Sequence, residues 1–244
     1  MQMSQMVKKL FFVLPLVLVS VAVGAFTWND PYDPYTGPYI GADIGASAVG
    51  INQTTVSQSG VFPSVAVGAS GSYNLSALGV EGGLFAGYGH RWAHHLYTGA
   101  EVYGMFNSAN ATANNQTSAP NLLTVSERVK GTFGASFDPG FFITPDTLAY
   151  LAVGPTFAVF NSKSTTGDGG LNGSSNTFTK TLVGGRFGGG FETTVYKNLN
   201  VRAEYDYSYF PSFNESSQSL TDGTVNTTYK PYSNEVLFSL IYHL

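Results

Sequence analysis

Hydrophobic and polar residues alternate along most of the chain, with the period of two that is typical of a β-strand with two different faces. In the segment 183–192, for example, Val183 and Phe187 fall on one face, while Arg186 and Glu192 fall on the other. The segments with this period, each of about ten residues, are 39–48, 78–91, 96–107, 128–138, 150–159, 183–192, 201–208 and 235–244. The first is the weakest because glycine and alanine dominate it. The pattern predicts eight strands.

The connectors between these strands alternate in length. Long polar connectors are expected at 51–76, 108–124, 161–177 and 211–232, and short turns at 92–95, 144–147 and 194–198. Strict alternation places all the long connectors at one end of an antiparallel sheet. Bacterial outer-membrane barrels show this asymmetry, with long loops outside the cell and tight turns in the periplasm. We therefore predict an all-β fold, an eight-stranded antiparallel up-and-down transmembrane β-barrel.

Alternation alone does not decide which face points inward, since a soluble lipocalin-like barrel would enclose the apolar face. Three observations favour the opposite, membrane-type arrangement. Glycines interrupt the polar face, where they make room for large side chains inside a narrow barrel. The last strand is apolar and aromatic up to Leu244. Aromatic residues also gather near the strand ends, as in two interfacial girdles: Tyr39, Trp92, Phe141, Phe142, Tyr196 and Tyr242 on the turn side, and Phe106, Phe160, Tyr209, Phe210 and Tyr232 on the loop side.

The composition agrees with this interpretation. Charged residues make up 11% of the chain, against about 25% in an ordinary soluble domain, yet the mean hydropathy is only +0.03. No apolar run after the first 25 residues is long enough for a transmembrane helix. Cysteine is absent, so disulfides and thiolate metal sites play no part.

The N-terminal residues have the pattern of an export signal. Lys8 and Lys9 precede the apolar stretch 10–23, and small residues at 23–25 offer a cleavage site. A membrane-spanning helix is the alternative, but a span needs about 20 apolar residues. We expect a signal peptide at 1–25, a periplasmic Pro/Tyr-rich lead-in at 26–36 and the barrel at 37–244. Without the two lysines, nine basic residues face 15 acidic ones, which argues against a nucleic-acid partner.

Several stretches carry a family resemblance: GPYIGADIGAS from Gly37, GGLFAGYGHRW from Gly82, LAYLAVGPTFA from Leu148, VGGRFGGGFE from Val183 and VRAEYDYSY from Val201. With them the chain resembles the small outer-membrane β-barrel domains of the OmpA/OmpX/Opa-like superfamily.

The resemblance implies residence in the bacterial outer membrane, contact with its lipid and lipopolysaccharide, and insertion by the barrel-assembly machinery. The closing VLFSLIYHL is similar to the assembly signal of such barrels, although it ends in leucine rather than phenylalanine. Its outward residues are Phe238, Leu240, Tyr242 and Leu244.

The inward faces carry the charges. If Glu192 lies opposite Arg202, then Gly190 faces Glu204, Gly188 faces Asp206 and Arg186 is diagonal to Asp206. The expected lumen network is Asp43, Glu101, Arg186, Glu192, Arg202, Glu204 and Asp206, and the same alternation places Glu81, Asp138, Glu235, Arg91, Arg128 and Lys130 inside. Either these charges pair directly and plug the lumen, or re-pairing of Arg186 or Arg202 opens a narrow path.

An enzymatic role is not expected. The histidines, at positions 90, 94, 95 and 243, all map to the turn side, away from the outer-leaflet lipid that a lipid-modifying barrel would act on. His94 and His95 lack a further ligand set nearby, so we predict no metal, no cofactor and no catalytic residue.

The long connectors are therefore the expected working surface. The first two carry no charged residue, which argues against binding of a polyanion. The apolar stretch 61–67 either packs on the barrel rim or contacts a host or neighbouring surface. The predicted function is surface interaction, of a surface-antigen or adhesin kind, or envelope integrity. The alternative is a narrow porin-like diffusion channel gated by internal salt bridges.

Overall fold

The computed structural model describes residues 33–57, 70–92, 95–116, 121–168, 174–218 and 224–244. The expected signal peptide and the first part of the lead-in, residues 1–32, lie outside them, as does the apolar stretch 61–67. The strands are β1 (Gly37–Ser57), β2 (Ser70–Trp92), β3 (Leu96–Asn107), β4 (Asn110–Gln116), β5 (Asn121–Thr144), β6 (Thr147–Asp168), β7 (Ser174–Tyr196), β8 (Leu199–Tyr209), β9 (Phe213–Gln218) and β10 (Thr224–His243).

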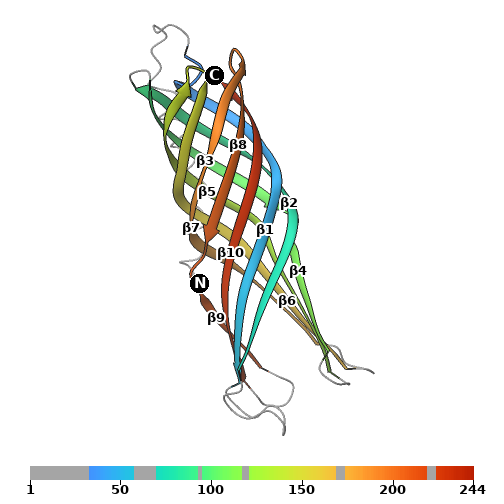
Figure 1. The fold of residues 1–244 in the computed structure, drawn as a ribbon. Coiled ribbons are helices and arrows are strands. Elements are labelled where there is room, and N and C mark those ends of the chain that lie inside the picture. Colours follow the sequence, from blue (N-terminus) through green and yellow to red (C-terminus); the bar gives the residue numbers. More distant parts are fainter. Residues whose placement is uncertain (1–32, 58–69, 93–94, 117–120, 169–173, 219–223) are drawn as a thin grey trace, which may run out of the picture.

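These strands form one closed antiparallel barrel (Figure 1). The order around the ring is β1-β2-β3-β5-β6-β7-β8-β10, and β10 pairs with β1 from Tyr39–His243 to Ser57–Val225. The short β4 follows β3 after a two-residue interruption, and β9 follows β8 after a three-residue interruption, so each pair fills one position in the wall. The predicted eight-stranded barrel is confirmed.

The connectors alternate as predicted, but the long ones are shorter than expected. Tight turns join β2 to β3, β5 to β6 and β7 to β8, and Lys197 in the last of them has a φ of 37°. The predicted long connectors are largely strand: β1 continues to Ser57 and β2 begins at Ser70. Serine, threonine and asparagine dominate these strand extensions, and buried apolar residues such as Ile51 and Tyr229 are too few among them to give the alternation that reveals a half-buried strand.

The outer surface of the barrel is apolar and the lumen is charged. On β10, Phe238 and Leu240 are 60% and 52% exposed, whereas Glu235 is 2% exposed. On β7, Phe187 and Phe191 are exposed while Arg186 and Glu192 are buried. A soluble barrel would have the reverse arrangement, so the structure agrees with the membrane-type prediction.

Four of the predicted girdle aromatics face the lumen instead. Tyr39, Phe142, Phe160 and Phe210 are at most 6% exposed. Each of the four is next in the sequence to a residue that faces outward, so the alternation of the strand turns it inward. Closeness to a strand end was therefore the wrong criterion for them. Trp92, Phe141, Tyr196 and Tyr242 on the turn side, and Phe106 and Tyr209 on the loop side, face outward.

A β-bulge in β5 corrects a second prediction. Val129 pairs with Phe160, but the next pair is Thr132 with Ala158, so β5 has one extra residue here. An extra residue reverses the facing of everything beyond it. Val129 consequently points inward, and Arg128 and Lys130 point outward rather than into the lumen.

At the loop end the barrel divides into two lobes. Beyond the pair Glu81–Asn107, β2 pairs only with β1, and β4 pairs only with β5. On the other side β9 pairs only with β10, while the first half of β7 pairs only with β6. Figure 1 shows the strand ends in two groups, with β1, β2, β9 and β10 in one and β4, β5 and β6 in the other.

Candidate functional site

Arg202 of β8 joins opposite walls of the lumen. Its Nη1 donates to Oε2 of Glu101 on β3 (2.9 Å), and its Nε and Nη2 donate to Oε2 of Glu192 on β7 (3.2 and 3.1 Å). In the ring order β3 lies opposite β8, so the pair with Glu101 spans the barrel. All three side chains are at most 8% exposed.

Arg186 of β7 forms the second ion-pair cluster. Its Nη2 donates to Oε1 of Glu204 (2.8 Å) and to Oδ2 of Asp206, both on β8. Its guanidinium also lies 4.3 Å from the centre of the Tyr103 ring on β3. Register confirms the predicted facing pairs, Glu192 with Arg202, Gly190 with Glu204 and Gly188 with Asp206.

Hydroxyl groups complete the network. Tyr39 donates to Oε2 of Glu101 (3.3 Å), Tyr150 donates to Glu204, and Ser239 donates to Asp43. Asp43 therefore has a serine as its hydrogen-bond partner, and no ion pair links it to the described arginines. The predicted lumen network did not include these tyrosines. Tyr39 nevertheless lies four residues before Asp43 and therefore on the same face of the strand, and Tyr150 directly precedes the outward Leu151.

His243 extends the network toward the turns. Its Nε2 lies 3.5 Å from Oε1 of Glu192, and Asn200 donates to the same oxygen (2.7 Å). His90 instead stacks edge-on against Trp92, and His94 lies outside the described residues. Within the described ranges, no three His, Asp or Glu side chains converge on a possible metal position. In the same ranges, no helix is long and apolar enough to cross a membrane.

Apolar layers cover this polar network at both ends. On the turn side, Tyr35 is fully buried, donates to the carbonyl of Asp146 (2.6 Å) and packs edge-on against Phe142. On the loop side a larger cluster lies across the lumen, formed by Val49, Ile51, Ala109, Val129, Ala158, Phe160, Leu182, Phe210 and Tyr229. The charged network thus lies between two apolar clusters, and a third buried cluster, which includes Phe85, Met105 and Leu237, packs beside the network.

Carboxylates outnumber arginines among the described lumen side chains. Arg186 and Arg202 face Asp43, Glu81, Glu101, Asp138, Glu192, Glu204, Asp206 and Glu235. Glu81 is 1% exposed and accepts no hydrogen bond from any described group. Arg91, also predicted inside, lies at the turn-side rim, with its guanidinium 3.8 Å from the Phe142 ring centre.

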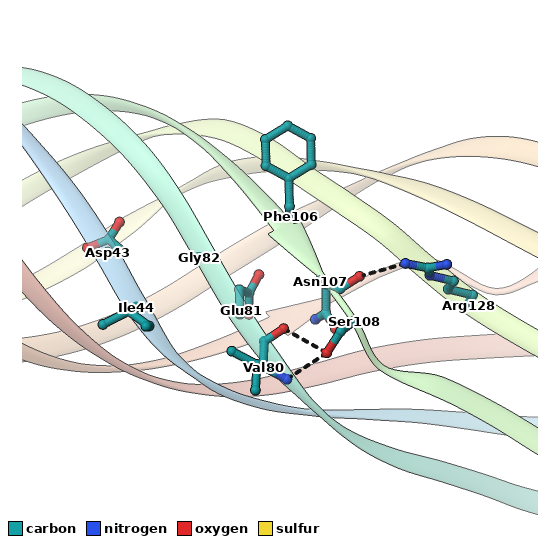
Figure 2. A pocket seen from close by; sticks show the side chains of 9 residues that line it. All are labelled: Asp43, Ile44, Val80, Glu81, Gly82, Phe106, Asn107, Ser108 and Arg128. Carbon is teal, nitrogen blue, oxygen red and sulfur yellow. Dashed lines mark hydrogen bonds between the residues drawn. The ribbon is translucent and has the colours of Figure 1, made fainter.

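A depression of about 400 Å³ marks the place where β2 and β3 stop pairing. Figure 2 shows that the hydroxyl of Ser108 connects the diverging strands there: its Oγ donates to the carbonyl of Val80 (3.1 Å) and accepts from the amide of Val80 (2.8 Å). Exposed apolar side chains of the outer wall, among them Phe106, line it together with Glu81 and Asn107. The depression therefore opens onto the lipid-facing surface.

The solved structures that match the chain include three small outer-membrane β-barrels. Neisserial surface protein A is 18% identical, with 82% of this chain and 97% of that chain covered and a TM-score of 0.36. The attachment invasion locus protein Ail of Yersinia pestis is 11% identical (79% and 97% covered, TM-score 0.27). OprG of Pseudomonas aeruginosa is 14% identical (86% and 98% covered, TM-score 0.47). Neither a protein-family model nor a curated protein sequence matches significantly.

Proposed function

We propose that this chain is a small, non-enzymatic bacterial outer-membrane barrel with a closed lumen, which acts through the strand extensions and loops at its long-connector end. In this proposal the chain is exported through a cleaved signal peptide at 1–25, and the barrel-assembly machinery inserts it by way of Phe238, Leu240, Tyr242 and Leu244. These four side chains are 50–60% exposed on the outer wall.

The apolar outer wall supports a position in a membrane. On β6 the outward positions from Leu151 to Val159 are apolar and are followed by Asn161 and Lys163. A tilted transmembrane strand needs about 9–11 residues, which this run supplies. No outward charged side chain interrupts the apolar belt in the described part of the barrel.

The ion pairs of Arg202 carry the argument for closure. Eight strands leave an interior only just wide enough for side chains to fill, and the bond from Arg202 to Glu101 crosses it. The apolar layers on both sides of this bond support a lumen without a continuous aqueous path. The extensions beyond the membrane then remain as the surface for contact with a host or a neighbouring surface.

Conductance in planar bilayers tests the closed lumen. The refolded protein is first shown to be folded by its shift between boiled and unboiled samples on a gel. We expect no stepwise conductance from folded protein. Stepwise channels of defined conductance would contradict closure. Binding assays with the loops at 58–69, 117–120, 169–173 and 219–223 shortened one at a time then test the surface role.

A narrow diffusion channel is the second candidate, because Glu81 is a buried carboxylate that accepts no hydrogen bond from the described part of the chain. Water or cations would satisfy such a group. If the channel exists, Arg202→Met should change its conductance and cation selectivity, since Arg202 joins the opposite walls. A silent wild-type barrel and a silent variant would remove this candidate.

A further inference from the structure

Three cations gather on the outer wall just above the apolar belt. Arg128 and Lys130 belong to β5 and Lys163 to β6, and all three are exposed. Lys163 pairs with Ser126, and Arg128 pairs with Asn161. Arg128 and Lys163 are therefore diagonal neighbours on one face, with Cβ atoms about 7–8 Å apart. Lys130 lies two residues from Arg128, inside the bulge.

No described carboxylate neutralises this cationic patch. Glu127, its nearest acid in the sequence, points inward and is 1% exposed. Arg128 makes one long hydrogen bond, 3.5 Å from Nη2 to the carbonyl of Asn107, which Figure 2 shows. The chain as a whole is acidic, yet the acids whose side chains are described on the barrel wall point into the lumen, while Asp168 of β6 and Glu215 of β9 belong to the strand extensions beyond the patch. Positive charge is thus exposed on the outer wall at the loop end.

The β5 bulge creates the patch. If the same sequence formed a regular strand without a bulge, Arg128 and Lys130 would share the inward face of Thr132 and Asp138. The bulge turns both cations to the outside, where a bulge commonly re-aims side chains.

The neighbours of the patch place it at the level of lipid headgroups. Directly below it, Phe133 and Phe157 stack with ring centres 5.1 Å apart and an interplanar angle of 10°. Aromatic side chains of this kind sit at the boundary between hydrocarbon and headgroups. The apolar outward run of β6 ends at Val159, before Lys163. The cations therefore meet the headgroup layer rather than open solvent.

We propose that Arg128, Lys130 and Lys163 form a binding site for the phosphate groups of an anionic glycolipid in the outer leaflet. Their three side chains donate to phosphate oxygens, while the acyl chains of the lipid lie along Phe133 and Phe157. The inference rests on the membrane position proposed above and adds a specific lipid contact to it.

Native mass spectrometry of the refolded protein in detergent measures this binding directly. The probes are bisphosphorylated lipid A and its dephosphorylated form, with inorganic phosphate as a soluble competitor. A cation near an anionic surface contributes about 1 kcal/mol, or roughly fivefold. The triple variant R128Q/K130Q/K163Q should therefore bind bisphosphorylated lipid A on the order of 100-fold more weakly, while K197Q at the opposite end should stay within about twofold of wild type.

If the triple variant does not fold, the variant K130Q/K163Q replaces it, because this variant keeps the hydrogen bond of Arg128 to Asn107. Its affinity for bisphosphorylated lipid A should fall roughly 30-fold. Equal binding by folded variant and wild type, or equal binding of the dephosphorylated lipid, would overturn the proposal. So would competition by millimolar inorganic phosphate, which would identify a soluble anion site instead. The gel shift and silent conductance of the same samples report separately on the closed barrel, so the two proposals can fail independently.

Discussion

Replacement of Arg202 by methionine tests the central cross-link of the barrel. The change keeps much of the volume of the side chain but removes the donors of three hydrogen bonds, one to Glu101 and two to Glu192. Both carboxylates stay buried, with only Tyr39, Asn200 and His243 as remaining described partners. Removal of one member of a buried ion pair costs about 3–5 kcal/mol. That is a large fraction of the roughly 5–15 kcal/mol that stabilises a typical fold.

Urea titration in lipid vesicles, followed by tryptophan fluorescence, measures the free energy of unfolding. We expect Arg202→Met to lower it by about 3–5 kcal/mol. The combination with Glu101→Gln and Glu192→Gln should recover most of that loss, because it removes the carboxylates that were left without a cation. As a control, the exposed Lys197→Met should change stability by about 0.5 kcal/mol or less. A loss below about 1 kcal/mol for Arg202→Met, the size of an exposed pair, would refute the reasoning, as would a triple variant no more stable than the single one.

Three further changes examine the packing and the outer wall by the same titration. Gly188→Ala should cost about 1–3 kcal/mol, since its Cβ would collide with the carboxylate of Asp206, whereas Gly185→Ala, with no atom within 4 Å of its Cβ, should be nearly neutral; equal effects would contradict the packing described. Phe187→Lys, on the lipid-facing wall, should cost about 2–4 kcal/mol, and an unchanged stability would argue against a lipid-covered surface. Tyr35→Ala should cost about 3–5 kcal/mol because Tyr35 is fully buried, and a loss under about 1 kcal/mol would show that the turn-side layer contributes little to stability.

Much of the fold follows from alternation along the chain. Once a short turn joins two strands, their register is nearly determined, and for this reason the sequence predicts Gly188 opposite Asp206 and Glu192 opposite Arg202. The pairing of Arg202 with Glu101 is a different matter. Those residues lie on opposite walls, and only the ring order and diameter of the closed barrel bring them together.

The facing of Arg128 and Lys130 was out of reach for a physical reason. A bulge inserts one residue whose type need not differ from that of its neighbours, so the sequence pattern hardly reveals it. Gly131 lies at this bulge, but a single glycine is weak evidence of a bulge in a chain with 29 glycines. The strand extensions of the long connectors were missed for a related reason. Serine, threonine and asparagine dominate these extensions, and their few inward apolar residues, such as Ile51 and Tyr229, do not give a clear contrast between two faces.

The closure of β10 on β1 sets the order in which this barrel is able to form. Residues at the two ends of the barrel sequence, such as Tyr39 and His243, are partners in the ladder, so the seam forms only after the last strand has arrived. Such distant pairings are slow to form because a long stretch of chain must be ordered first. Until then both β1 and β10 present open edges, which are prone to pair with other chains. The unassembled chain is therefore most vulnerable to aggregation in the interval before its final strand is in place.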